Sequence, residues 1–286
     1  MAHDRILADI IADVAAILGP ELTGITVTRA VVGVYFTGVA LSTGTAGVCA
    51  TPAKTTLHAA CCPEAGDTVI PPGTLRGRRA VDLLEEISSP HALRRAVGIA
   101  TLNALADACW QRCPHPEIVL REEMDAFDAA AIVAGEHVVL VGAFIPFLRA
   151  LKRMGQDYTV LELNPTMLKP DEVPHFRPGD AAADVIPRGD VVLLTGSTLL
   201  NGTLEDLLLL ARPQARVVVV GPTVGLLPDA FLRRGVDVLG GVRVTAPDAF
   251  LDVLAEGGSG QHFFGRSASR VALLRRSPKQ DAVGAA

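Results

Sequence analysis

The sequence predicts an α/β protein in which a smaller α+β module precedes a Rossmann-like, doubly wound parallel sheet. Two observations lead to this prediction. After residue 137, short runs rich in valine and leucine alternate with helical segments, which is the pattern of a parallel sheet covered by helices on both faces. Before residue 112 that alternation is missing, and three strand-like runs follow one another between helices. The length of 286 residues suits two domains of ordinary size.

The first module is predicted to contain three helices and three strands. Its opening helix is amphipathic, with Ile6, Ile10 and Val14 on one face. Ser89 is expected to cap the last helix, with Pro90 at its first position. Glycines punctuate the three strands, as in hairpins. In order, the predicted elements are a helix over 4–18, strands over 25–34, 35–42 and 46–51, and helices over 78–87 and 90–111.

A linker is predicted over 112–124, where Cys113-Pro114-His115-Pro116 interrupts any helix. We therefore assign residues 1–112 to the first domain, 125–276 to the Rossmann-like domain and 277–286 to a disordered tail. After the linker, the predicted strands lie over 137–141, 158–161, 190–194, 216–220, 236–239 and 270–274. The predicted helices lie over 125–133, 147–154, 204–210, 228–234 and 249–255.

Charge and composition argue against several classes of protein. The formal net charge of -5 disfavours a nucleic-acid-binding protein, which needs a clustered positive surface. No apolar run reaches the roughly 18 residues needed to span a membrane, and the first residues do not form a secretory signal. We expect a cytoplasmic protein, and in that compartment its cysteines stay reduced.

A ligand site is expected where the strands of the second module end. Ligands of doubly wound sheets bind outside the carboxyl ends of the strands, at the point where the strand order reverses. Four predicted strands end in small or polar residues. These ends carry Gly142 and Phe144, then Glu162 and Asn164, then Thr195-Gly196-Ser197-Thr198-Leu199-Leu200-Asn201-Gly202-Thr203, and finally Gly221-Pro222-Thr223.

The first two strand ends bear on the class of ligand. Gly142 alone remains of a Gly-x-Gly-x-x-Gly fingerprint, and Phe144 and Pro146 stand where a pyrophosphate needs close approach, which disfavours NAD or FAD. Glu162 follows Gly142 by 20 residues, at the spacing where an acidic residue takes ribose hydroxyls. The same geometry suits an adenosine-type ligand without a pyrophosphate, such as S-adenosylmethionine. The alternative is a solvated acid at a strand end, and the sequence leaves both open.

The segment 195–203 is the richest in hydrogen-bonding groups. Thr203 is expected to cap the following helix, with Asp206 in capping-box register. Thr195, Ser197 and Asn201 are not needed for that cap, and backbone N–H groups of this loop are suited to hold an anionic or carbonyl oxygen. We therefore favour a ligand site here over a plain turn. At 221–223 a plain turn is an equally good interpretation.

Metal and nucleophile candidates are weaker. Cys109 and Cys113 lie four residues apart with His115 close behind, and Cys61-Cys62 are adjacent, but no second pair completes a tetrahedral zinc site. We therefore predict no metal bound by protein ligands and no structural zinc. Asn103 lies in an apolar helical stretch, where it must be hydrogen-bonded. It either ties its helix to neighbouring backbone or reaches a ligand at the domain interface.

An ordered set of motifs runs through the chain: Gly98-Ile99-Ala100-Thr101-Leu102-Asn103-Ala104-Leu105, Gly142-Ala143-Phe144, Leu161-Glu162-Leu163-Asn164-Pro165, the segment 195–203 and Gly221-Pro222-Thr223. This set resembles the heavy-metal chelation domain family over nearly the whole chain. The resemblance implies an enolase N-terminal-like domain before a Rossmann-like domain, with the two combining to form one site. It also implies handling of a chelator or metal-linked small molecule, of pterin-like, flavin-like or siderophore-like chemistry. It brings no enolase chemistry, because the Mg²⁺-binding barrel is absent.

Three functions stay open at this point. The first is an enzyme acting on a chelator-like or heteroaromatic metabolite in heavy-metal homeostasis. The second is a non-catalytic binding or delivery protein for a chelated metal, and the third is a nucleoside-dependent transferase of the S-adenosylmethionine type. The expected partner is a small-molecule or metal-chelate ligand, with no nucleic acid and no membrane, and a homodimer stays open. The sequence names no cofactor and no catalytic residue. An acid–base pair in the cleft favours an enzyme, whereas neutral hydrogen-bonding groups favour a binding protein.

Overall fold

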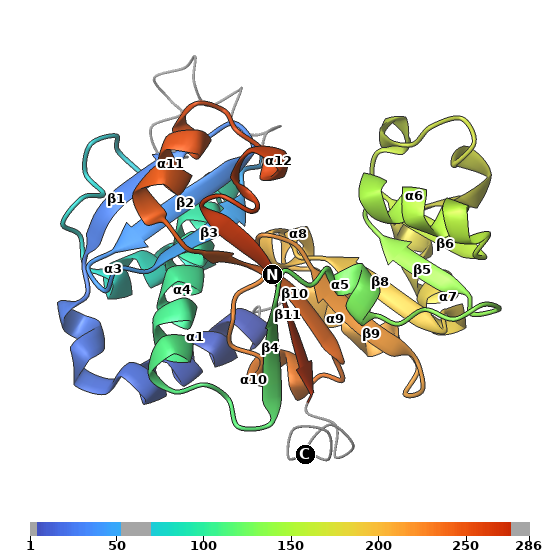
Figure 1. Ribbon diagram of the computed structural model, residues 1–286, viewed down its shortest axis with the longest axis horizontal. Coiled ribbons are helices and arrows are strands. Elements are labelled where there is room, and N and C mark those ends of the chain that lie inside the picture. Colours follow the sequence, from blue (N-terminus) through green and yellow to red (C-terminus); the bar gives the residue numbers. More distant parts are fainter. Residues whose placement is uncertain (1–4, 53–69, 276–286) are drawn as a thin grey trace.

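The computed structural model describes residues 5–52 and 70–275 and confirms the predicted fold class (Figure 1). The first module carries a three-stranded antiparallel sheet, and the second carries an eight-stranded, mostly parallel sheet. The tail predicted at 277–286 lies outside the described residues. Among the helices that the structure describes, none is both long and apolar enough to cross a membrane.

The first module follows the predicted order of elements. These are α1 (Arg5–Leu18), the 3₁₀ helix η1 (Gly19–Gly24), β1 (Val27–Val32), β2 (Phe36–Leu41), β3 (Ala46–Ala50), α3 (Ala80–Leu84), the 3₁₀ helix η3 (Glu85–Ser88) and α4 (Ala92–Arg112). The predicted cap of α4 is wrong by two residues. Its N-cap is His91, and the Ser89 hydroxyl accepts a hydrogen bond from the His91 N–H at 3.2 Å instead.

The second module contains more elements than the sequence predicted. Its strands are β4 (Ile118–Glu122), β5 (Val138–Val141), β6 (Tyr158–Glu162), β7 (Phe176–Pro178), β8 (Val191–Thr195), β9 (Arg216–Val220), β10 (Val238–Val244) and β11 (Ala268–Arg275). Its α-helices are α5 (Ala126–Ala129), α6 (Ile145–Met154), α7 (Ala182–Val185), α8 (Ser197–Asn201), α9 (Leu204–Leu210), α10 (Asp229–Leu232), α11 (Pro247–Ala255) and α12 (Gly260–Phe263). Short 3₁₀ helices are η4 (Pro165–Met167), η5 (Val173–His175), η6 (Gly179–Ala181) and η7 (Ile186–Arg188).

The strand order of the large sheet is β4-β11-β10-β9-β8-β5-β6-β7. From β10 to β7 all neighbours are parallel, and this is the Rossmann order in which the chain moves outward in both directions from the central pair β5 and β8. The order therefore reverses between β5 and β8. Strands β11 and β4 extend the other end in antiparallel pairs.

Strand β4 corrects the prediction of a plain linker over 112–124. Residues 118–122 pair with β11, so this part of the linker belongs to the large sheet. The segment Ile118-Val119-Leu120 is apolar, but it is too short to show a strand period, and its partner lies about 150 residues further along the chain. A pairing between such distant segments leaves no local signal in the sequence.

The small sheet of the first module is covered on both faces, by one helix from each module. On one face, α4 packs so closely that a Cβ at Gly47 would lie 2.2 Å from both the Ala100 oxygen and the Ala104 nitrogen. On the other face, a Cβ at Gly38 would meet the side chain of Leu251 in α11 at 2.6 Å. Figure 1 shows α11, drawn in orange-red, lying beside the blue strands β1 and β2. The second module thus completes the core of the first.

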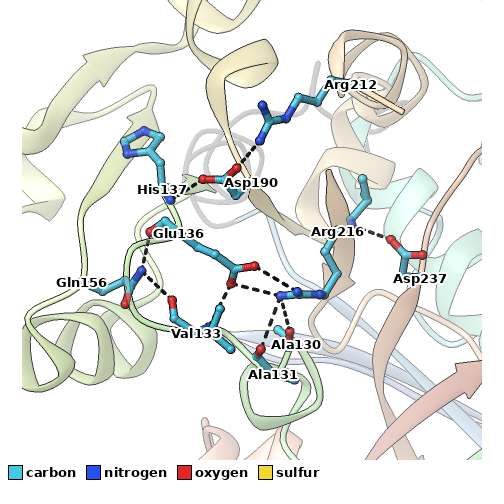
Figure 2. A network of polar contacts seen from close by, with 11 residues as sticks. Ala130, Ala131, Val133, Glu136, His137, Gln156, Asp190, Arg212, Arg216 and Asp237 are labelled. Carbon is cyan, nitrogen blue, oxygen red and sulfur yellow. Dashed lines mark hydrogen bonds and ion pairs between the residues drawn. The ribbon is translucent and has the colours of Figure 1, made fainter. Parts of the chain in front are cut away.

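A polar network joins the amino ends of β5, β8 and β9, at the opposite edge from the predicted site (Figure 2). The Arg216 guanidinium lies 3.0 Å from the Glu136 carboxylate and also donates to the Ala130 carbonyl at 2.9 Å. Asp190 accepts the His137 N–H at 2.7 Å and pairs with Arg212. The Arg216 hydrogen bond holds the pKa of Glu136 below its ordinary value. These contacts fix the amino ends of the three strands, at the edge of the sheet opposite the predicted ligand site.

The close approach of α4 to β3 predicts a large effect of Gly47→Ala. The added methyl group meets helix backbone rather than a movable side chain, so the free energy of unfolding should fall by about 3 kcal/mol. Gly24→Ala is the control, because a Cβ there meets nothing within 4 Å, and its effect should stay within about 0.5 kcal/mol. Urea denaturation followed by circular dichroism measures both. Equal stability of the two variants would contradict the packing of α4 on β3.

The Glu136–Arg216 pair predicts a pH-dependent effect of Glu136→Gln. Because its folded pKa lies below the ordinary 4.5, the carboxylate stabilises the fold above that pH, and this contribution is lost as the pH falls through the lowered pKa. The substitution should cost about 1 kcal/mol at pH 7 and lose its effect in acid. Asp206→Asn on the exposed surface of α9 is the charge-matched control. Urea titrations at pH 7 and at a pH below the lowered pKa of Glu136 test this, and an effect of equal size at both would refute it.

Candidate functional site

A cavity of about 420 Å³ opens at the carboxyl ends of β5, β6 and β8, where the strand order reverses. This is the position that doubly wound sheets use for ligands. Its walls are mainly apolar, with hydroxyl and amide groups on the β8 side. The lining residues are Val141, Gly142, Ala143, Phe144, Leu161, Glu162, Leu163, Gly179, Ala182, Thr195, Ser197, Thr198, Asn201, Thr203 and Leu207.

Most of the residues predicted from the strand ends lie in this cavity. They are Gly142, Phe144, Glu162, Thr195, Ser197, Thr198, Asn201 and Thr203. All lining residues that the structure describes belong to the second module. The resemblance implied one site formed by both domains, whereas the described lining comes from the second domain alone.

Gly142 sets the close approach of the two central strand ends. Its φ of +99° is a conformation that residues with a side chain rarely adopt. A Cβ at this position would also lie 3.0 Å from the Thr195 methyl group, across the switch point. Both the backbone conformation and the close Thr195 side chain therefore require glycine at position 142, at the end of the first parallel strand.

Glu162 lines the cavity, but its carboxylate already accepts three backbone hydrogen bonds. Its Oε2 accepts the Ala143 N–H at 2.8 Å, and its Oε1 accepts the N–H groups of Leu163 and Asn164 at 2.8 and 3.0 Å. A carboxylate offers about four acceptor positions, so little capacity is left for ligand hydroxyls. The predicted contact with ribose hydroxyls is thus weakened, and Glu162 mainly joins the loops after β5 and β6.

The segment 195–203 forms the polar wall through a series of short-range hydrogen bonds. The Thr195 hydroxyl accepts the Ser197 N–H at 3.2 Å, and the Thr198 hydroxyl donates to the Thr195 carbonyl at 2.5 Å. The predicted capping box at Thr203 is wrong. Thr203 makes no side-chain cap for α9, and its hydroxyl donates instead to the Asn201 Oδ1 at 2.7 Å. This competing local turn holds the Asn201 side chain at the cavity wall.

Six of the predicted residues lie outside the cavity lining, and several of them have a structural role. The Asn103 amide of α4 donates to the carbonyls of Val48 and Thr223, both at 2.9 Å. The Thr223 hydroxyl is buried and accepts the Ala50 N–H at 3.1 Å. Asn103 and Thr223 therefore tie the first module to the loop after β9. The six are Asn103, Asn164, Gly196, Gly221, Pro222 and Thr223.

Apart from Phe144, the large apolar side chains of the lining were not among the predicted site residues. Leu163 is 81% exposed at the rim of the cavity, and its side chain lies over Gly179, where a Cβ would approach it to 2.7 Å. Leu207 of α9 and Ala182 of α7 complete this side. The sequence places Val141, Ala143, Leu161 and Leu163 at two of the predicted strand ends, whereas Gly179, Ala182 and Leu207 lie outside all four.

The metal-ligand candidates do not come together in the structure. Burial raises the pKa of the Cys109 thiol to about 12, which opposes formation of the thiolate that binds metals. Cys113 is exposed, and His115 lies 3.2 Å from Asp229 instead. Cys61-Cys62 lies outside the described residues. Within 5–52 and 70–275, no three histidine, cysteine, aspartate or glutamate side chains are grouped so that they could hold a metal ion.

Comparison with known proteins adds the family. A family model described as "Putative heavy-metal chelation" matches residues 125–273, and a second model with the same description matches residues 15–106. The chain belongs to this family. The two matches fall on the second and first modules respectively, as the resemblance of the motifs indicated.

Solved structures of the same family share the fold. A protein of unknown function from Desulfitobacterium hafniense is 19% identical, with a TM-score of 0.71 over 96% of this chain and 100% of the other. One from Pyrococcus horikoshii is 18% identical, with a TM-score of 0.68 over 93% and 98%. An uncharacterized protein of Methanocaldococcus jannaschii is 28% identical over 181 residues, and this match spans 61% of the chain and 64% of that relative.

Because Asn103 joins the two modules, replacing it should lower the stability of the fold and leave the cavity unchanged. Asn103→Ala removes two hydrogen bonds to largely buried carbonyls, so the free energy of unfolding should fall by about 1–3 kcal/mol. The affinity of any molecule that binds in the cavity should not change. Urea denaturation, together with titration calorimetry of a molecule released from the purified protein, measures both. Unchanged stability with weaker binding would return Asn103 to the ligand site.

Proposed function

We propose that this chain is a binding protein for a small organic molecule, free or carrying a chelated metal, and that the molecule lies in the cavity between β5 and β8. The observation that carries this proposal is the composition of the cavity. Apolar groups of β5, β6 and α9 face hydroxyl and amide groups of the segment 195–203 at the switch point of the sheet. Most small-molecule sites combine a largely apolar wall with a few fixed polar groups in this way.

Binding without catalysis is supported by the ionisable groups. Glu162 is the single ionisable side chain among the described residues that line the cavity. General acid–base chemistry needs a group within reach that can donate and accept a proton, and Glu162 is engaged by three N–H groups. The hydroxyl and amide groups opposite are suited to orient a ligand.

The same argument supports a metal that arrives with its chelator. Heavy metals with soft or intermediate character prefer sulfur and nitrogen ligands, and the described residues of the lining contribute neither thiol nor imidazole. A chelating molecule of siderophore-like or pterin-like chemistry would bring its own donor atoms to the metal. The protein would then recognise the organic part of the complex.

A nucleoside ligand is the second candidate. The Rossmann strand order favours it, because the cavity lies where such folds bind nucleotides, although three N–H groups already occupy most of the acceptor capacity of Glu162. S-adenosylmethionine fits this description. A transferase of that type would bind it in the purified state, whereas a carrier of chelates would not.

The polar wall gives the direct test of this proposal. Native mass spectrometry and elemental analysis of freshly purified protein identify the co-purifying molecule, and S-adenosylmethionine is titrated in parallel by calorimetry. Ser197→Ala and Asn201→Ala should each weaken binding of the identified molecule by about 1–3 kcal/mol while the fold stays intact. Thr74→Ala, on an exposed turn of the first module outside the cavity lining, is the control. Protein that carries no molecule, or variants that bind like the wild type, would refute the site.

A further inference from the structure

The loop between β5 and α6 is the place where Rossmann folds hold a phosphate. In those folds a glycine-rich turn presents backbone N–H groups to the pyrophosphate at the start of the following helix. Here the equivalent turn is Gly142-Ala143-Phe144, followed by α6. This turn can therefore bind a phosphate only if its N–H groups are not already donating hydrogen bonds within the protein.

All three of these N–H groups are already used within the protein, and that of Gly142 donates to the Leu161 carbonyl at 2.8 Å. The Ala143 N–H donates to the Glu162 Oε2 at 2.8 Å, and the Phe144 N–H donates to the Gly142 carbonyl at 3.0 Å. Pro146, in the first turn of α6, has no N–H to offer. The protein has thus placed its own carboxylate at the turn, in the position that an external phosphate would take.

The other residues around the turn also disfavour a bound phosphate. The Phe144 ring lines the cavity and stacks on Phe147, with ring centroids 5.0 Å apart, so it fills space that a second glycine would leave open. Among the described lining residues there is no lysine or arginine to offset the charge of a phosphate. A phosphate at the turn would lie next to the Glu162 carboxylate, and like charges at such a distance repel.

We infer that the cavity excludes phosphorylated ligands and accepts neutral or cationic ones, and that Glu162 determines this selection. The inference rests on the proposed function, because it describes which molecules that cavity admits. Glu162 serves as an internal anion that satisfies the turn and leaves the apolar wall free for an uncharged or positively charged ring system. This class includes nucleosides and sulfonium compounds without phosphate, and it excludes dinucleotides.

The test is a titration with inorganic phosphate, followed at the Ala143 amide by nuclear magnetic resonance of ¹⁵N-labelled full chain. In the wild type this amide should not respond. In Glu162→Ala it should shift with saturation, and phosphate affinity should rise about tenfold or more, as expected when a charge-assisted hydrogen bond becomes available. Glu162→Gln removes the charge and keeps one oxygen, which can still accept the Leu163 and Asn164 N–H groups while the Ala143 N–H loses its acceptor. It should also gain affinity, and it decides the question if Glu162→Ala fails to fold.

Asp206→Asn is the charge-matched control, because it removes one negative charge from the exposed surface of α9 without freeing an amide. It should behave like the wild type. Wild-type protein that binds phosphate as well as the Glu162 variants do would overturn the inference, as would Glu162 variants that gain no more than Asp206→Asn. Such a result leaves the proposed function standing if an organic molecule co-purifies. Conversely, a gain in Glu162→Ala with no molecule in the wild type would count against the proposed function alone.

Discussion

The chain leaves β5 toward β6 and leaves β8 toward β9, so the loops that follow these two neighbouring strands run apart at one edge of the sheet. A parallel sheet needs crossover connections, and where their direction changes no connection crosses the gap between the two strand ends. The cavity is the space left there. Its shape follows from the positive φ of Gly142 on one side and the local turns of the segment 195–203 on the other.

The edge of the sheet opposite the cavity is fixed by charge rather than left open. Arg216 pairs with Glu136, and Asp190 binds both the His137 N–H and Arg212. Half-buried ion pairs of this kind contribute modestly to stability, but each also satisfies backbone groups at the strand ends. The two edges of the sheet thus differ. Ion pairs between side chains cover one edge, and the other presents hydroxyl groups and apolar side chains to a ligand.

The sequence was sufficient to predict the fold class, most strands and most of the polar lining, because these depend on local patterns. Valine-rich runs identify parallel strands, and the carboxyl ends of such strands meet in any doubly wound sheet. It was insufficient where distant segments decide. Strand β4 forms through its pairing with β11. Asn103 joins the two modules because the fold brings the carbonyls of Val48 and Thr223 within hydrogen-bond distance of its amide. The Thr203 prediction failed for a local reason, since Asn201 competes for the same hydroxyl.

Helix α11 follows the sixth parallel strand of the second module, yet it forms part of the core of the first, where Phe250, Leu251 and Leu254 pack with Ala40 and Val48. The boundary along the chain is therefore not a boundary in space. A gene fragment ending near residue 112 would produce a sheet with one face uncovered, and a fragment starting there would expose the matching helix. Exchange of single modules between relatives would thus break a shared core, which gives a physical reason for the two halves to be inherited as one unit.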